Sequence, residues 1–500
     1  MLTKEEIVKS VPQTGFVGQP KGLFTLFFTE FWERFSYYGM RAILLYYMYD
    51  SVNDGGLGLA EDKALIIMSL YGALIYMSGI IGGWIADRIT GTRKAIFYGG
   101  ILIMFGHIAL SLPIGASGLY ASMVLIIVGT GLLKPNVSAV VGDLYADNDG
   151  RRDAGFSIFY MGINLGAFIS ALVTGGVQQA AGYHAGFAVA AVGMALGLIV
   201  YLWRQKDLGL AGSQAPNPLL PEERKKTAMM FIIGAVVIAA VLLIAKATGT
   251  LNIENFSLMI TFLGIAIPTA LITIMYRSNK TTADEKSRVL AYIPLFICAV
   301  MFWAIADQSA TVLAAFVDKR TDLSLGSFII PAAWFQSLNP MFIIMVAPLF
   351  ALMWTKLGDR GPSTPKKFAL SLFFSGASFL IMIVAIALAG TGLINPLWVV
   401  ASFFLVVVGE LLLSPVGLSA TTKLAPKAFA GQTMALWFLA SAAAQAINSQ
   451  LVRVYSALAE GNGPSGEMMY FGILGGISIA LGLILIFLSP MISRAMRGIK

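Results

Sequence analysis

The sequence predicts an all-α protein that crosses a membrane many times. Two observations carry this prediction. Hydrophobic residues make up 57% of the 500-residue chain and charged residues 12%, about half of the roughly 25% usual in soluble domains. The apolar residues also form continuous runs and do not alternate with polar ones, which favours membrane helices over a membrane β-barrel. A chain with so little polar surface is not expected to form soluble domains.

Fourteen apolar runs have a length close to the roughly 20 residues that a transmembrane helix needs. The N-terminal segment before the first run contains acidic residues and lacks a short apolar core, so we expect no cleavable signal peptide. In chain order the runs cover residues 23–49, 64–86, 95–115, 118–142, 154–178, 182–203, 227–245, 255–276, 289–316, 328–354, 368–391, 396–420, 430–452 and 468–490.

The distribution of Lys and Arg gives an orientation. If the N-terminus is placed in the cytoplasm and the runs alternate in direction, most of the basic residues fall in cytoplasmic segments, such as 88–94, 204–226 and 277–288. The positive-inside rule then predicts that both termini are cytoplasmic. The net charge of +8 is explained by this topology, and no nucleic-acid partner is needed to account for it.

The runs divide into two groups of six, separated by a linker and an additional pair of helices. The linker at 204–226 is rich in Gly, Pro and charged residues. We therefore expect a six-helix bundle over 1–203, a linker with two additional helices over 204–288, and a second six-helix bundle over 289–500. The motif LLKP at 132–135 and the motif LLSP at 412–415 occupy equivalent helices. Internal repeats of this kind suit a transporter with its site between two halves, although chance similarity between apolar helices remains an alternative.

Seven ionisable residues fall inside the predicted helices. Each would cost about 2.5–3.5 kcal/mol at the centre of the bilayer if it were unpaired. Positive and negative charges nearly balance, so we expect these residues to face one another or a water-filled cavity. Static ion pairs are the alternative, but buried pairs are poor net stabilisers. The seven are Glu30, Glu33, Arg34, Arg41, Lys134, Asp307 and Glu410.

Four polar residues of the run 23–49 form one stripe. Glu30, Arg34, Tyr37 and Arg41 recur at helical spacing and lie on one face, over a rise of about 16 Å. Glu33 flanks this stripe.

Counting from the cytoplasmic ends of the helices places the intramembrane charges at two levels. The outer level holds one base and one acid, Arg41 and Asp307. The inner level holds two acids and two bases, Glu30, Arg34, Lys134 and Glu410. Other polar side chains join these levels, although hydrogen bonding between helices would explain any one of them. They are Tyr71, Asn164, Asn339, Trp437 and Ser441.

Several motifs, in order along the chain, resemble those of the proton-dependent oligopeptide transporters, the POT or PTR family. Residues 30–39, EFWERFSYYG, resemble the E-x-x-E-R signature, and residues 159–166, FYMGINLG, resemble the second signature. The segments 133–136, 334–340 and 409–417 also match. The resemblance runs from about residue 15 to the C-terminus. It implies the major facilitator fold with 14 transmembrane helices, two of them extra helices of bacterial members, in a bacterial plasma membrane.

The resemblance also implies roles for individual residues. A first group would receive the carboxylate of a peptide: Arg34, Tyr38 and Lys134. A second group would receive its amino end: Asn164, Asn339 and Glu410. Tyr71, Trp437 and Ser441 resemble wall positions of the substrate pocket. The gate residues would be the outer pair Arg41 and Asp307, together with Lys134 and Glu410.

One residue departs from the family pattern. Relatives usually have Glu where this chain has Asp307. The side chain is one methylene shorter, so we expect a weaker outer pair or an altered proton affinity.

The function expected from the resemblance is proton-coupled import of di- and tripeptides by alternating access. Its proton-coupling residues would be Glu30, Glu33, Arg34 and Asp307, and protons would be its coupling ion without any other cofactor. The chain would act as a monomer in the bilayer. A site for peptides of varied sequence should hold their constant charged ends, which calls for a cation and an anion on opposing walls.

Other functions remain open at this stage. A family member could carry another anionic or zwitterionic solute, such as nitrate or a peptide-like drug, and a peptide-sensing receptor is a further alternative. The sequence has no nucleotide-binding P-loop, no Cys cluster and no H-E-x-x-H motif, so we expect neither ATP drive nor a metal site. A membrane enzyme would need a nucleophile with a base in reach, and no such pair stands out.

Overall fold

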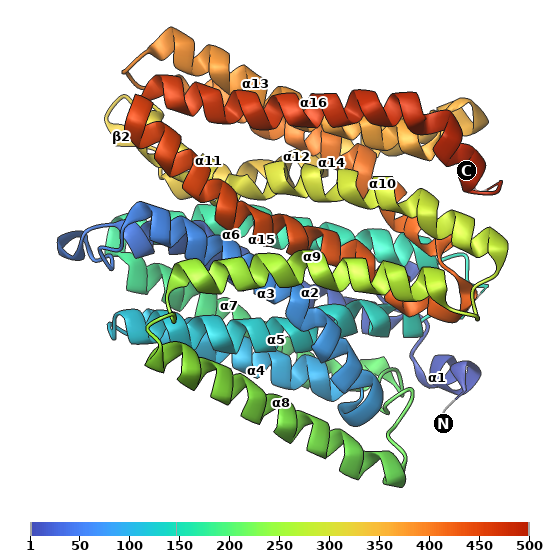
Figure 1. Cartoon of the computed structure of the whole chain (residues 1–500). Coiled ribbons are helices and arrows are strands. Elements are labelled where there is room, and N and C mark those ends of the chain that lie inside the picture. Colours follow the sequence, from blue (N-terminus) through green and yellow to red (C-terminus); the bar gives the residue numbers. More distant parts are fainter. Residues whose placement is uncertain (1–2, 147, 499–500) are drawn as a thin grey trace. The chain divides into compact units, whose positions relative to one another are not determined.

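The computed structural model describes residues 3–146 and 148–498. It is almost entirely helical (Figure 1). A short N-terminal helix precedes six long ones: α1 (Lys4–Ser10), α2 (Lys21–Tyr49), α3 (Glu61–Ile85), α4 (Thr92–Ser111), α5 (Ala116–Asp143), α6 (Arg152–Ala181) and α7 (Tyr183–Arg204).

The rest of the chain continues in the same way. The additional pair consists of α8 (Pro221–Ala247) and α9 (Ile253–Arg277). The last group contains α10 (Ala283–Ala306), α11 (Val312–Arg320), α12 (Leu338–Leu357), α13 (Thr364–Ala389), α14 (Pro396–Leu424), α15 (Ala430–Asn462) and α16 (Pro464–Ala495). The two strands, β1 (Ser324–Leu325) and β2 (Phe328–Ile329), form a short antiparallel hairpin.

Within the described residues, twelve helices are long and apolar enough to cross a membrane. The polytopic helical fold predicted from the sequence is therefore confirmed. Helices α2 and α15 are not among the twelve. Every long window of α2 contains several charges, and α15 carries buried amides at Gln445 and Asn448. The total of fourteen spans and the cytoplasmic placement of the termini remain predictions.

Two predicted helices differ in detail from the observed ones. The run 289–316 is interrupted by a 3-10 turn at Asp307–Ala310, after which Thr311 leaves the helical region at φ −129° and ψ −106°. The interruption is stabilised by Gln308, which donates to the Ala304 carbonyl and accepts from the Tyr470 hydroxyl at 2.8 Å. The run 328–354 begins with strand β2 and a 3-10 segment at Ala332–Ser337, and α12 follows.

The chain forms two compact units, each made of several segments. The first contains residues 1–37, 77–166 and 187–260, and the second contains residues 38–76, 167–186 and 261–500. The boundaries of this division fall inside α2, α3, α6, α7 and α9. The division does not test the predicted bundles 1–203 and 289–500 or the linker 204–288, which remain predictions.

Close helix packing holds each unit together. In the first unit, α4 and α5 approach at Gly99 and Gly129, where a Cβ atom on Gly99 would lie 2.6 Å from the Gly129 carbonyl oxygen. In the second unit, α13 and α16 meet at Gly376 and Gly475, where a Cβ atom on Gly376 would lie 2.8 Å from the Gly475 oxygen. Small residues at such crossings let helix backbones approach closely in a membrane.

Candidate functional site

The charged stripe of α2 forms a buried cluster in the first unit. Arg34 Nε lies 3.2 Å from Glu30 Oε1 and also pairs with Glu33. The Arg34 guanidinium lies 5.4 Å from the ring centre of Tyr37. Glu30 is 4% exposed, Glu33 0% and Arg34 2%. The structure thus brings together the three neighbouring residues that the sequence selected for proton coupling.

This acidic pair has unused acceptor capacity. Glu30 Oε2 and Glu33 Oε1 are buried and accept no hydrogen bond from the described part of the chain. A buried charged oxygen without a partner is costly, and a proton on either acid would remove the charge and create an O–H donor. Lys134 on α5 is close enough to interact electrostatically with Glu30. Proton uptake at this cluster would therefore change the partners available to Arg34 and Lys134.

A second acid is oriented by an amide in the second unit. Asn339, near the start of α12, donates from Nδ2 to Glu410 Oε2 on α14 at 3.0 Å. This contact joins two residues that the family resemblance assigned to the amino end of a peptide. The hydrogen bond orients one oxygen of the Glu410 carboxylate.

The three predicted wall residues lie on α3 and α15, also in the second unit. Tyr71, Trp437 and Ser441 are 2%, 8% and 6% exposed. Trp437 packs so closely on α14 that a Cβ atom on Gly417 would lie 2.0 Å from its Cη2 atom. Next to Tyr71, a Cβ atom on Gly72 would lie 2.7 Å from the Gln445 side chain of α15. Tyr71 and Trp437 are therefore closely packed, and the role of the three residues in a substrate pocket remains a prediction.

Four predicted site residues lie outside these contacts, and their roles remain predictions. Asn164 on α6 lies in the first unit, where its Nδ2 donates to the Tyr160 carbonyl at 3.0 Å. Tyr38 is half-buried on α2. Arg41 and Asp307 both belong to the second unit, and Asp307 is 8% exposed where α10 ends. Their expected ion pair remains a prediction.

Sequence reasoning missed a cluster near the helix ends that the charge distribution assigns to the outside. We call it the outer cluster, and its members are Tyr49, Asp50, Glu61, Tyr183, Asp318 and Lys319. Tyr49 donates to Asp318 Oδ2 at 2.7 Å, and Tyr183 donates to Asp50. Lys319 pairs with Glu61 and lies 5.0 Å from the Tyr49 ring centre. In the sequence these residues look like ordinary charged helix ends, and only tertiary packing reveals them.

The outer cluster carries more acids than bases. The pKa of the Asp50 carboxyl is raised above its usual value, chiefly because the group is buried. The nearby charge of Asp54 adds to this shift, whereas the hydrogen bond from Tyr183 and the charge of Lys319 oppose it. Protonation of Asp50 would reduce the excess negative charge around Lys319.

Further ties fix the same end of the second unit. Trp334 Nε1 donates to the Leu172 carbonyl at 3.0 Å, and Ser337 Oγ donates to the Phe168 carbonyl at 2.8 Å. Arg320 lies 3.1 Å from Glu467 and also bonds the carbonyls of the 390–392 turn. The 3-10 segment Ala332–Ser337 is therefore hydrogen-bonded to α6, and α11 is separately tied to α16 and to the turn after α13.

Comparison with known proteins identifies the family. The sequence profile of the POT family matches residues 93–468. A di-/tripeptide transporter of Lactococcus lactis subsp. cremoris is 45% identical to this chain, and the match covers 97% of this chain and 98% of the relative. A solved peptide transporter in complex with sulfate is 60% identical, covers 100% of both chains and has a TM-score of 0.96. A solved POT family transporter in complex with 5-aminolevulinic acid is 46% identical, covers 97% of this chain and 99% of its own, and has a TM-score of 0.93.

The relatives are transporters and not enzymes, which agrees with the absence of a catalytic constellation in the sequence. Their similarity extends over nearly the whole chain, and the helices of this protein have the length and apolarity of membrane spans. The chain is therefore a multi-pass transporter of the plasma membrane that belongs to the POT family.

Proposed function

We propose that this protein imports di- and tripeptides together with protons by alternating access. The observation that carries the proposal is the buried group of Glu30, Glu33 and Arg34, in which two acids share one base. Such a group can gain a proton without leaving an unpaired charge behind. The di-/tripeptide transport named for the L. lactis relative supports the choice of substrate.

The substrate ends would be held by groups of opposite charge. Arg34, Tyr38 and Lys134 would receive the carboxylate, while Glu410, with Asn164 and Asn339, would receive the amino end. The side chains of the peptide would lie against Tyr71, Trp437 and Ser441. This division explains how one site accepts many sequences, because only the constant ends are bound by charge. The 5-aminolevulinic acid bound by one relative also carries an amino and a carboxyl end.

Proton binding would release the basic partner of an acid. A proton on Glu30 or Glu33 removes one of the charges that hold Arg34. Arg34 could then bind a peptide carboxylate more strongly, which couples the two ligands. An inside-negative potential would supply about 2.3 kcal/mol per charge per 100 mV to such a cycle. We propose that the protein completes this cycle as a monomer, without a further cofactor.

Counterflow in proteoliposomes tests transport of peptides against the other candidate functions. Vesicles loaded with unlabelled dialanine are expected to accumulate labelled dialanine transiently, without an imposed gradient. Nitrate loaded in place of dialanine should give no accumulation. Binding of dialanine without counterflow would indicate a receptor, and exchange of nitrate alone would indicate a different solute.

The outer gate is expected to respond to Asp307. We propose that Arg41 attracts ionised Asp307 and favours the state that is closed to the outside. Asp307→Asn mimics the protonated acid and should raise the outward-open population by about 5- to 150-fold. Distances between spin labels on the outer ends of α2 and α11 would report the shift.

Asp322 is exposed just after the end of α11, so Asp322→Asn is the matched control and should leave the distances unchanged. Identical distance distributions for wild type and Asp307→Asn would show that Asp307 does not control the gate.

A further inference from the structure

A polar stripe on α15 continues beyond the proposed wall residues Trp437 and Ser441. Gln445 and Asn448 follow Ser441 at intervals of four and three residues. At about 100° per residue, all four side chains lie within roughly 80° on one face of the helix. The charge distribution in the sequence assigns the start of α15 to the cytoplasm. The two amides therefore lie toward the outside, about 6 and 10 Å beyond Ser441 along the helix.

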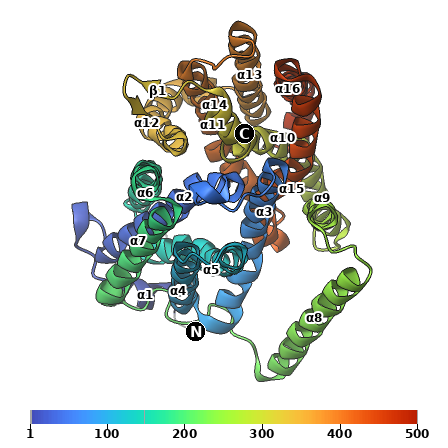
Figure 2. The same ribbon diagram turned by 90° about the vertical axis from the view of Figure 1, so that its left-hand side faces the viewer.

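The opposite face of α15 packs against α9. A Cβ atom on Gly264 would lie 3.1 Å from the Ala446 Cβ atom, and Thr261 Oγ1 donates to the Ala446 carbonyl at 2.9 Å. Figure 2 shows the two helices side by side. The stripe therefore faces away from α9, and all of these residues belong to the second unit.

The face of α15 that carries the stripe meets α3. A Cβ atom on Gly72 would lie 2.7 Å from Gln445 Cδ, 2.8 Å from its Oε1 and 2.9 Å from its Nε2. The amide group thus occupies the space that a side chain at position 72 would take. Its neighbour on α3 is Tyr71, which is also a proposed wall residue, so Gln445 belongs to the same wall.

Both amides of the stripe are buried without a hydrogen-bond partner in the described part of the chain. Gln445 and Asn448 are each 1% exposed, and none of their amide nitrogen and oxygen atoms forms a hydrogen bond there. Gln450 on the α9 side of the same helix donates from Nε2 to Thr261 Oγ1 at 3.1 Å. Among the described residues of α15, the buried unpaired amides therefore both lie on the stripe.

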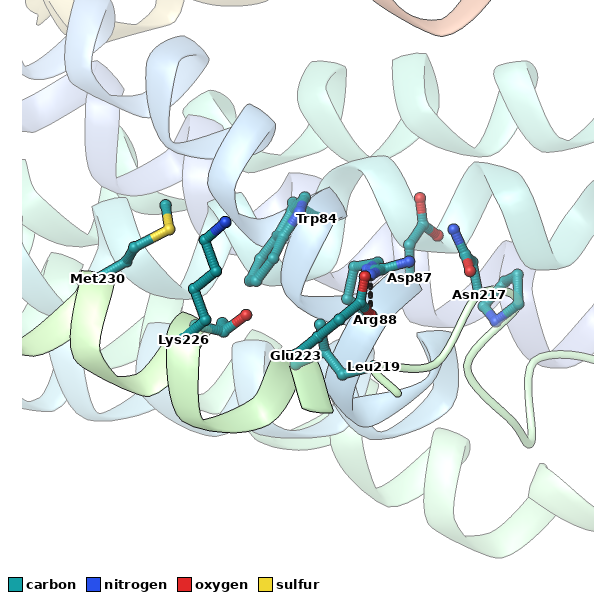
Figure 3. Close-up of a pocket in the computed structure, with 10 residues that line it drawn as sticks. Trp84, Asp87, Arg88, Asn217, Leu219, Glu223, Lys226 and Met230 are labelled. Atoms are coloured by element: carbon teal, nitrogen blue, oxygen red, sulfur yellow. Dashed lines mark hydrogen bonds and ion pairs between the residues drawn. The ribbon is translucent and has the colours of Figure 1, made fainter. Parts of the chain in front are cut away.

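The cleft in Figure 3, at the turn that follows α3, shows the usual arrangement. Arg88 Nη2 and Glu223 Oε2 lie 2.6 Å apart, and the same oxygen accepts from the Leu220 amide at 3.0 Å. These side chains are partly exposed, and they are nevertheless paired within the chain. An amide that is buried without a partner costs more free energy, which a bound polar molecule would recover.

A primary amide is suited to binding a peptide group. It offers an N–H donor and a C=O acceptor, which pair with the C=O and the N–H of a peptide main chain. Such pairing does not depend on the side chains of the peptide, which suits a site that accepts many sequences. A substrate main chain that lies along Trp437 and Ser441 would meet Gln445 and Asn448 next.

We infer that Gln445 and Asn448 bind the second peptide group of a tripeptide, which a dipeptide lacks. An extended dipeptide spans about 7 Å and a tripeptide about 10 Å. With the amino end at Glu410, the longer peptide reaches further along the stripe. The proposed wall residues are also buried, so we assign the contact to the state in which this wall is open to the substrate. This role rests on the proposed transport of peptides.

Competition against labelled dialanine in proteoliposomes tests this role. Gln445→Met and Asn448→Leu remove the amide and keep a side chain of similar size. Each should weaken binding of trialanine about 2- to 12-fold, as expected for loss of a hydrogen bond. The affinity for unlabelled dialanine should change by less than about twofold, because a dipeptide has no second peptide group to lose this contact.

A depsipeptide gives a measurement that a purely structural role would not change. An ester in place of the second peptide bond of trialanine removes one N–H and keeps the length and both charged ends. Wild type should bind trialanine more tightly than this ester analogue. The difference should disappear in the variant that carries both Gln445→Met and Asn448→Leu, because the partners of that N–H are gone.

Gln450 supplies the matched control on the same helix. Its side chain is partly buried and bonded to Thr261 on the α9 side. Gln450→Met should therefore change the binding of dialanine and trialanine equally or not at all, and it should keep the preference for trialanine over the ester.

Three results would overturn the role of the two amides. One is equal loss of dialanine and trialanine binding in Gln445→Met and Asn448→Leu, which would make the amides structural. Another is unchanged affinity for both peptides, as expected if the amides bind only water. The third is the same preference for trialanine over its ester in wild type and in the double variant. Failure of wild type to bind dialanine at all would instead contradict the proposed function itself.

Discussion

Glu30→Gln and Glu33→Gln are each expected to abolish uptake of dialanine driven by a proton gradient, while peptide exchange remains at least partly intact. Glutamine keeps the size of the side chain but cannot change its charge. The ion pairs with Arg34 would no longer respond to protons. Exchange can proceed in both directions with the protonation of the carrier unchanged, so it should survive. Uptake and exchange of labelled dialanine would be compared in the same proteoliposomes.

An exposed glutamate supplies the control for this comparison. Glu5 pairs with Lys9 at the surface of α1 and is largely exposed, so Glu5→Gln should leave both activities unchanged. Full concentrative uptake by both Glu30→Gln and Glu33→Gln would remove these residues from the coupling mechanism.

Glu410→Gln is expected to weaken binding of a free dipeptide while barely affecting an N-acetylated one. Loss of a charge-assisted contact costs about 1.5–3 kcal/mol, which corresponds to roughly 10- to 150-fold in affinity. Wild type should itself prefer the free dipeptide by a similar factor, because acetylation removes the positive charge that Glu410 would bind. Competition against labelled dialanine would give all four affinities. Glu410→Gln and acetylation of the dipeptide remove the same contact, so their effects on the binding free energy should not add.

Two further variants sharpen the result. Asn339→Ala removes the hydrogen bond that orients Glu410 and should cause a smaller loss, with the same preference for free peptides. Glu460 lies exposed at the end of α15, and Glu460→Gln should behave like wild type. Equal competition by free and acetylated dipeptides in wild type would argue against a clamp on the amino end.

The sequence alone predicted the polytopic helical fold and the buried acid–base cluster of α2. Both depend on local signals, because apolar runs of sufficient length and charges at helical spacing leave few alternatives in a membrane. The pairing of Glu30, Glu33 and Arg34 follows from their positions on one helix. The contact between Asn339 and Glu410 joins two helices; the resemblance to the family placed both residues in one group but did not predict the contact.

Other features could not be predicted because they depend on tertiary packing. The break after α10 relies on Gln308, whose side chain is held by Tyr470, a residue far away in the sequence. The outer cluster joins Asp50 to Tyr183 and Asp318 to Tyr49. Each of these residues lies near a helix end, where a polar or charged side chain needs no partner to be explained. Sequence periodicity therefore gave no reason to expect their association.

Uptake of labelled dialanine into proteoliposomes under an imposed gradient tests the central claim most directly. With an inward proton gradient or an inside-negative potential, wild type should concentrate the dipeptide above its external level. A protonophore should reduce the internal level to equilibrium, and ATP should have no effect. Concentrative uptake that survives the protonophore, or that requires ATP, would contradict proton-coupled peptide import.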